Sequence, residues 1–223
     1  MTLNTHVFED FTERGDFHQV ILLGVIILMD QSKKDPTKSN LMYLTIFLLL
    51  TISASRELAM SLNAEFRLAI KLDLVELKGT SYTYADLVFV SVYGLIKNGP
   101  RLLKPIYKSI IAILSNLAPY TKCLCKEGCD GLMYLVQVFA NNRFLMEKED
   151  NCKTLGSLIE AINYLIAYHD ETNHYLQIQL MKYQTLFDYL DNNLAEIGVQ
   201  KTDQPVLAIQ SSRPEQAVPE ETT

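Results

Sequence analysis

The chain has 223 residues, a net charge of −6 at pH 7 and a hydrophobic content of 48%, enough to form a sizeable core. Because nucleic-acid binding depends on clustered Lys and Arg that neutralise phosphates, this acidic composition argues against DNA or RNA as a partner. The chain contains only 9 Gly and 7 Pro, which favours long helices over many short, turn-linked strands.

The N-terminal sequence, MTLNTHVFEDFTERGDF, lacks the positive flank and the apolar run of a secretory signal. Thr2 does not fit the myristoylation pattern either, because that pattern requires Gly directly after the initiator Met. Without an export signal, we expect the four Cys to be reduced thiols rather than disulfides.

Two apolar runs, VILLGVIILM (20–29) and LMYLTIFLLLTISA (41–54), flank a charged connection and predict two helices joined by a loop. One continuous membrane span is excluded, because each charged residue of the connection would cost roughly 2.5–3.5 kcal/mol at the bilayer centre. The second run alone would form a helix of about 21 Å, short of the ~30 Å hydrocarbon core. Buried core helices are therefore favoured, and a membrane-embedded hairpin of the two runs is the alternative.

Residues 65–77, EFRLAIKLDLVEL, largely alternate between apolar and charged side chains. This period of two predicts an extended, half-buried segment. No second strand of similar quality follows, and an isolated strand is rarely stable. We therefore expect residues 65–78 to form an extended arm that lies against a helical body rather than in a sheet.

Five further helices are predicted, at about 84–98, 100–117, 128–146, 154–169 and 175–193. The first begins at Thr83 and Asp86, a T-x-x-D pattern related to the capping box. Asn98-Gly99-Pro100 ends it and begins the next helix. Pro105 predicts a bend or a late start in that second helix, and Pro119 ends it.

The first two of these helices are apolar around most of their circumference. Successive residues are about 100° apart, so the polar residues of helix 84–98 fall within one arc of about 140°. They are Thr83, Asp86, Ser91, Gly94, Lys97 and Asn98. The next helix repeats the pattern, and its inward residues would be Ile106, Ile110, Ile111, Ile113 and Leu114. Each helix offers roughly twice the apolar face of a simple hairpin, so it must be covered from more than one side.

We therefore predict an all-α fold of stacked antiparallel helix pairs, similar to a fragment of a HEAT or armadillo α-solenoid. A compact bundle with a central helix also fits this pattern. The helical domain would span residues 1–197, including the extended arm. Residues 198–223 are rich in Pro, Gln, Glu and Ser, which predicts a disordered tail.

Two clusters contain residue types that could bind a metal. The first consists of Cys123, Cys125, Cys129 and Cys152. Its C-x-C-x3-C spacing with a distant fourth Cys is atypical of structural zinc sites, so free thiols are expected. The second consists of His169, Asp170, Glu171 and His174. It lies where two helices should be joined, so a solvated loop is expected, and a Cys/His metal protein is the alternative.

Sequence motifs of nucleotide-binding and hydrolytic enzymes are absent from the chain. No G-x-S-x-G, P-loop, G-x-G-x-x-G or H-E-x-x-H pattern occurs. We therefore expect a protein without enzymatic activity, and no catalytic residue, cofactor or metal is assigned.

The segments LTISASRELAMSLN (50–63) and GTSYTYADLVFVSVYGLIKNGPRLLKPIYKSIIAILSNLAPYTKCL (79–124) resemble the high-temperature-induced dauer-formation proteins, relatives of dymeclin. The family pattern is a Ser-Arg helix end, an extended arm, G-T-x-A-D-L, a G-x-x-R-L-x-P turn and N-x-x-P-Y-x-K. The last motif occurs unchanged in residues 116–122, G-T-x-A-D-L is stretched by three residues, and the turn is respaced. The matching positions are Gly79, Thr80, Asp86, Gly99, Arg101, Leu102, Pro105, Asn116, Pro119, Tyr120 and Lys122. The resemblance covers roughly residues 41–190.

This resemblance implies a non-enzymatic, cytoplasmic protein that associates peripherally with the Golgi membrane and acts in cargo sorting and vesicle formation. Its partners would be proteins of the trafficking machinery, and the Tyr residues and Leu102-Leu103 are candidate anchors for them. The chain departs from the family pattern in having Thr2 where a lipid-bearing glycine would lie, and in being several times shorter than typical members. Attachment by a lipid is therefore not carried over.

Overall fold

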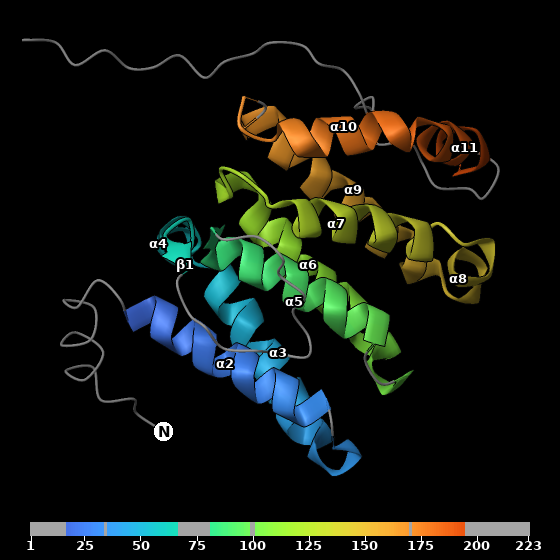
Figure 1. The fold of residues 1–223 in the computed structure, drawn as a ribbon. Coiled ribbons are helices and arrows are strands. Elements are labelled where there is room, and N and C mark those ends of the chain that lie inside the picture. The colour runs from blue at the N-terminus through green and yellow to red at the C-terminus, as the bar shows by residue number, and fades with distance from the viewer. Residues whose placement is uncertain (1–16, 34, 67–80, 99–100, 170, 195–223) are drawn as a thin grey trace, which may run out of the picture.

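The structure is a computed structural model that describes residues 17–33, 35–66, 81–98, 101–169 and 171–194. Helices make up most of this part of the chain, so the predicted all-α class is confirmed (Figure 1). The predicted division into a domain of residues 1–197 and a tail reaches beyond the described residues and stays a prediction.

The first helix pair consists of α2 (Phe17–Lys33) and α3 (Ser39–Ser53), the two predicted apolar helices. The short 3-10 helix η1 (Pro36–Lys38) joins them. Asp35 caps η1, because its Oδ1 accepts a hydrogen bond from Thr37 N at 3.0 Å. The loop is therefore closed by local polar contacts, while the apolar runs on either side pack against each other.

The predicted arm begins in a small sheet rather than only lying against helices. After α4 (Arg56–Ser61), strand β1 (Glu65–Phe66) pairs antiparallel with β2 (Tyr82–Thr83). The expectation that the arm has no strand partner is thus wrong for its first two residues. The partner was missed because two paired residues leave no period in the sequence. The rest of the arm, residues 67–78, lies outside the described residues.

The second pair is formed by α5 (Tyr84–Asn98) and α6 (Tyr107–Leu117). Between them lies η2 (Arg101–Ile106), a 3-10 helix that contains Pro105, so the predicted late start is confirmed. The short helix η3 (Ala118–Tyr120) contains Pro119 and follows α6 directly. Both boundaries agree with the prolines that predicted them.

The remaining helices are α7 (Lys126–Phe139), α8 (Asn142–Glu147), α9 (Glu149–His169), α10 (His174–Lys182) and α11 (Gln184–Leu194). Three predicted boundaries are wrong. Helix 128–146 breaks because Asn141 caps α8, its Oδ1 accepting from Arg143 N at 2.9 Å. Helix 154–169 starts earlier, at Glu149, and helix 175–193 divides at Tyr183.

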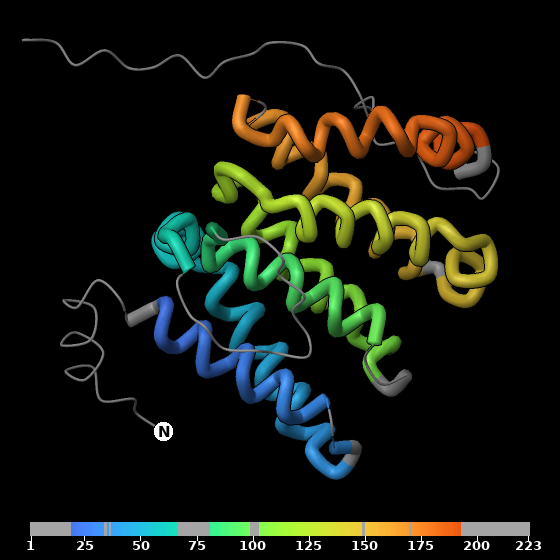
Figure 2. Tube along the Cα trace, in the orientation of Figure 1, coloured from blue at the N-terminus to red at the C-terminus, as the bar shows by residue number. Residues whose placement is uncertain are grey.

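The helices form a two-layered stack. Helices α2, α5, α7 and α10 lie in one layer, and α3, α6 and α9 lie behind them (Figure 1). Successive helices pair across the layers, and each pair packs on the next one. Figure 2 shows the chain running back and forth along this stack from its blue to its red end. The arrangement is the predicted stack of antiparallel helix pairs.

Helix α5 is enclosed within the stack. It contacts α2, α6 and α7, and the four consecutive residues Leu87, Val88, Phe89 and Val90 are all buried. Coverage from more than one side is therefore confirmed. Only part of the polar arc of α5 faces solvent: Lys97 and Asn98 are exposed, but the other described residues of the arc are covered by neighbouring elements. These covered residues are Thr83, which is partly buried, and Asp86, Ser91 and Gly94, which are buried.

Candidate functional site

The family-motif positions were the sequence-based candidates, and the structure describes most of them. Three of them, Gly79, Thr80 and Gly99, lie outside the described residues. Arg101 and Leu102 begin η2, but their side chains also lie outside the described part of the chain. Pro105 is exposed within η2. The remaining positions gather around the connection between α6 and α7.

Asp86 joins the start of α5 to the start of α7. Its Oδ2 accepts hydrogen bonds from Thr83 N at 2.8 Å and from Thr83 Oγ1 at 3.0 Å, while Thr83 Oγ1 accepts from Asp86 N at 3.1 Å. This is the reciprocal capping box that the sequence predicted. The other oxygen, Oδ1, accepts from Cys125 N at 2.7 Å. Asp86 is 3% exposed, so its carboxylate holds two elements together inside the stack.

Residues 119–125, here called the 119–125 seam, run from η3 to the start of α7. From the end of α4, the Asn63 side chain donates to Tyr120 O at 2.8 Å and accepts from Lys122 N at 2.9 Å. Next to the seam, Asn116 Nδ2 donates to Ser53 Oγ of α3 at 3.0 Å. The intact N-x-x-P-Y-x-K motif is therefore one place where the first and second pairs are joined by polar contacts.

The opposite side of the seam is held by the connection between α9 and α10. Asn173 Oδ1 accepts from Leu124 N at 2.9 Å, and its Nδ2 donates to Leu165 O and His169 O, each at 3.0 Å. The Thr172 hydroxyl donates to Lys122 O. The seam is thus fixed from α4, from α5 and from the α9–α10 connection.

Sequence reasoning missed Asn63 and Asn173, two of the side chains that bind the seam. Each lies just outside a helix, where Asn commonly bonds to backbone groups, and this was the available signal. Their bonding partners are far away in sequence and could not be read from it. Asn173 and Asp86 satisfy backbone N–H groups inside the stack, and Asn63 holds Lys122 N at its surface, so the motif positions around the seam have a structural role.

The four Cys are free thiols, and only Cys123 is exposed. Burial raises the pKa of the Cys123, Cys125 and Cys129 thiols above the ordinary value, and the charge of Asp86 adds to the effect in each. A thiol held in its protonated form is a poor nucleophile and a poor metal ligand. Among the described residues, no group of three or more His, Cys, Asp or Glu side chains could hold a metal ion.

The second ligand cluster is only partly the solvated loop that was predicted. His169 ends α9, and its Nε2 lies 3.1 Å from Pro119 O, so it is tied to the seam rather than to a solvated loop. His174 begins α10 and is exposed, as is Glu171. Asp170 lies outside the described residues.

The candidate anchors differ in accessibility. Tyr43, Tyr168 and Tyr189 are exposed, so these side chains are available for contacts. Leu103 is fully buried, so its proposed role as an anchor is wrong. Leu103 was predicted at the surface because the sequence did not reveal the 3-10 helix η2. The tight geometry of η2 points the Leu103 side chain toward the core.

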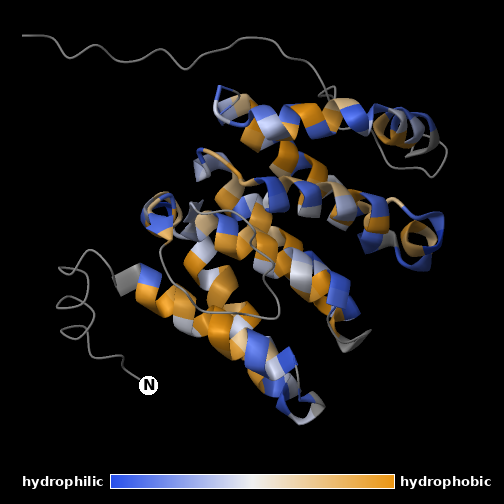
Figure 3. Cartoon of the chain, in the orientation of Figure 1, coloured by the Kyte–Doolittle hydropathy of each residue, from blue (hydrophilic) through white to orange (hydrophobic). Residues whose placement is uncertain are grey.

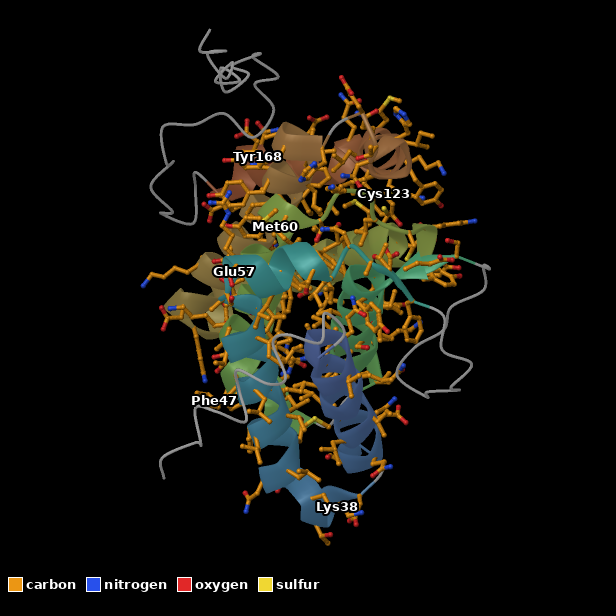
Figure 4. The ribbon with its side chains drawn as sticks, turned by 90° about the vertical axis from the view of Figure 1, so that its left-hand side faces the viewer. Lys38, Phe47, Glu57, Met60, Cys123 and Tyr168 are labelled. Atoms are coloured by element: carbon orange, nitrogen blue, oxygen red, sulfur yellow. The ribbon has the colours of Figure 1, made fainter. Side chains whose placement is uncertain are left out.

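An exposed apolar surface was also missed. Helix α3 was expected to be a buried core helix, yet Tyr43, Leu44, Phe47 and Leu48 are exposed on one side of it. We call these four residues the α3 outer face. Leu44 is 52% exposed and Phe47 63% exposed, and Figure 4 places Phe47 on the side of α3 that faces away from α2. Exposed apolar surface of this kind marks contact sites in soluble proteins.

The sequence alternative of a membrane hairpin finds no support in the helices. None of the helices in the described ranges combines the length and the hydropathy that a bilayer span requires.

Comparison with known proteins matches residues 3–222 to the Hid1 family model, described as high-temperature-induced dauer-formation protein. Protein HID1 of Dictyostelium discoideum is 31% identical over 169 residues, which are 76% of this chain and 18% of that relative. Human Protein HID1 is 26% identical over 172 residues, 77% of this chain and 21% of the relative.

The Schizosaccharomyces pombe relative named Ubp5-interacting protein ftp105 is 24% identical over 183 residues, 80% of this chain and 20% of the relative. The chain therefore spans about a fifth of the length of the curated relatives it matches. No solved structure matches the chain significantly.

Proposed function

Because the chain belongs to the Hid1 family, we propose that it is a non-enzymatic helical scaffold that binds partner proteins of Golgi and secretory-vesicle trafficking. Membership of this family is the observation that carries the proposal. The trafficking role comes from the family resemblance of the motifs in residues 50–124. The scaffold role comes from the stacked helices, which are suited to presenting long surfaces to other proteins.

The contacts of the described polar residues support binding rather than catalysis. The side chains of Asp86, Asn63 and Asn173 each accept a hydrogen bond from a backbone N–H of the 119–125 seam. Burial raises the pKa of the Cys125 and Cys129 thiols, which disfavours the nucleophilic form. The α3 outer face and the exposed Tyr168 and Tyr189 are apolar and aromatic, and such side chains anchor protein interfaces.

We place the protein in the cytoplasm, peripherally associated with the Golgi membrane. The thiols are free, in keeping with a reducing compartment. The Schizosaccharomyces pombe relative is named for its interaction with Ubp5, and we infer that protein binding is the role of the shared region as well.

The proposal is tested by expressing the tagged chain in cells, imaging it with a Golgi marker, and identifying neighbours by proximity labelling. We expect Golgi enrichment, trafficking proteins among the labelled neighbours, and release of the chain from membranes by alkaline carbonate. A uniformly cytosolic distribution with no trafficking protein labelled would overturn the proposal. Retention after carbonate would show an integral protein instead.

A matched pair of variants separates binding from folding in this experiment. Leu44→Asp changes the α3 outer face, and Met181→Asp introduces the same charge at an exposed apolar position of α10. If partners bind the α3 outer face, Leu44→Asp should reduce the labelling of trafficking proteins while Met181→Asp leaves it unchanged.

A further inference from the structure

The α3 outer face differs from the solvent-facing sides of the other helices in its layer. On α6 the exposed side includes Lys108, and on α9 it includes Lys153 and Glu160. On α3 the equivalent exposed side presents Leu44, Phe47 and Leu48. In Figure 3 the visible turns of α3, behind α2, are mostly orange, in keeping with its apolar sequence. Helix α3 is thus the member of this layer that has an apolar face without a covering helix in the described residues.

The exposed residues of α3 are spaced for helix packing. Leu44, Phe47 and Thr51 follow one another at intervals of three and four residues, with Asn40 and Ala54 continuing the series at its two ends. Such spacing puts them on one side of the helix, where another helix can pack. Phe47 lies in the middle of the series, so the stripe is nearly symmetric about it.

The charges at the two ends of the stripe are complementary. Lys38 lies nine residues before Phe47 and Glu57 lies ten residues after it. Figure 4 shows Phe47 between them along this side of the molecule. Lys38 also forms an exposed ion pair with Asp35, at 3.7 Å, and Arg56 neighbours Glu57. A helix lying antiparallel to α3 and carrying the same sequence would bring its Glu57 toward Lys38 and its Lys38 toward Glu57.

The opposite end of the stack does not offer a matching surface. The exposed sides of α10 and α11 include the polar residues His174, Lys182, Gln184, Asp188 and Asn192, which surround the exposed apolar side chains of Ile178, Met181 and Tyr189. A contact between the α3 outer face of one copy and this surface of another would be heterologous, would set apolar side chains against polar ones, and would generate rings or open filaments. Pairing of two α3 outer faces about a two-fold axis covers apolar surface on both copies and closes the assembly.

We propose that the occupant of the α3 outer face is a second copy of this chain, docked antiparallel about Phe47 with Lys38 of each copy facing Glu57 of the other. This inference is independent of the trafficking role. It concerns the 223-residue chain as it stands.

The mass of the purified chain in solution tests the proposal, measured by light scattering and sedimentation between about 1 and 100 μM, the range of a weak interface. We expect twice the chain mass of 25.4 kDa at the upper concentrations. Phe47→Glu should raise the dissociation constant at least about tenfold while leaving the circular dichroism and melting temperature of the dilute chain unchanged. The matched control is Met181→Glu, which changes a similarly exposed apolar residue, 69% against 63%, and should leave dimerisation intact.

The charges allow a test that a change in folding cannot mimic. Lys38→Glu and Glu57→Lys should each weaken self-association, because each places like charges opposite one another. An equimolar mixture of the two variants should form heterodimers, because both ion pairs are then restored with reversed sign. A chain that stays monomeric throughout, a mass that grows without limit, or equal sensitivity to Phe47→Glu and Met181→Glu would overturn the proposal.

Discussion

Helices α5 and α3 are both apolar around most of their circumference, yet the stack treats them differently. Helix α5 contacts α2, α6 and α7, and even its Asp86 and Ser91 are buried. Helix α3 belongs to the first pair, and Leu44 and Phe47 face solvent although they are as apolar as the residues of α5. The apolar content of a helix therefore predicts how much of its surface must be covered. The position of the helix in the stack determines which part of that surface is covered by other helices of the same chain.

The largest expected effect on stability comes from placing a charge at a buried position of the stack. Leu114 lies fully buried in α6, so Leu114→Asp should unfold the chain, because a buried unpaired carboxylate costs several kcal/mol against a total stability of about 5–15 kcal/mol. Ile110→Asp, at another fully buried position, should do the same. Leu44→Asp makes the same chemical change on the α3 outer face and should shift the free energy of unfolding by about 0.5 kcal/mol.

Urea unfolding followed by circular dichroism measures these differences, at a low protein concentration so that association does not contribute. Leu114→Met is the control at the buried position, because it nearly conserves volume and should cost less than about 1.5 kcal/mol. Near-normal melting of Leu114→Asp would mean that α6 is not enclosed. Unfolding by Leu44→Asp would mean that the α3 outer face is covered within the monomer.

The second effect concerns the 119–125 seam, a polar connection that the α3 outer face lacks. Asn173→Ala removes the acceptor for Leu124 N and the donors for Leu165 O and His169 O. Because Leu124 N would then lie inside the stack without its acceptor, while His169 O keeps the backbone N–H groups of Thr172 and Asn173 as donors, the expected loss is about 1–3 kcal/mol. Asn192→Ala removes an exposed side chain that donates to Asp188 O, and should change stability by less than about 0.5 kcal/mol. Equal melting temperatures for the two variants would show that the seam carries no stability.

Local signals in the sequence predicted much of the second pair. Thr83 and Asp86 predicted the capping box, and Pro105 and Pro119 predicted the late start of α6 and its end, because caps and prolines act over a few residues. The stack itself followed from two neighbouring helices that each carry a wide apolar face.

Features that depend on distant contacts could not be predicted in this way. The burial of Asp86 depends on Cys125 N, and the role of Asn173 depends on Leu124 N, so neither was visible in the local sequence. Leu103 and Phe47 show the same limit for apolar residues. One was expected at the surface and is buried, and the other was expected in the core and is exposed.

The third effect compares close packing in the middle of the stack with open space at α2. A Cβ added at Gly131 of α7 would lie 2.9 Å from Cγ and 3.0 Å from Cβ of Tyr93, which belongs to α5. Gly131→Ala should therefore lower stability by about 1–2 kcal/mol, because overpacking outweighs the gain in helix propensity. Gly24→Ala in α2 meets nothing within 4 Å and should raise stability by about 0.5–1 kcal/mol. Chemical denaturation measures both changes, and the same sign for the two would contradict the difference in packing.

The smallest effect comes from one hydroxyl inside α5. Ser91 Oγ is the buried side-chain oxygen without a hydrogen-bond partner among the described residues, whereas Thr45 Oγ1, buried in α3, donates to Met42 O at 2.8 Å. Removing an unpartnered buried hydroxyl relieves its desolvation cost, so Ser91→Ala should stabilise the chain by about 1 kcal/mol. Thr45→Val keeps the shape of the side chain but removes the hydroxyl that donates to Met42 O. This variant should therefore give no such gain in stability. This gain is expected because the enclosure of α5 keeps water away from Ser91. If Ser91→Ala left stability unchanged or lowered it, α5 would be less completely covered than the inner side of α3.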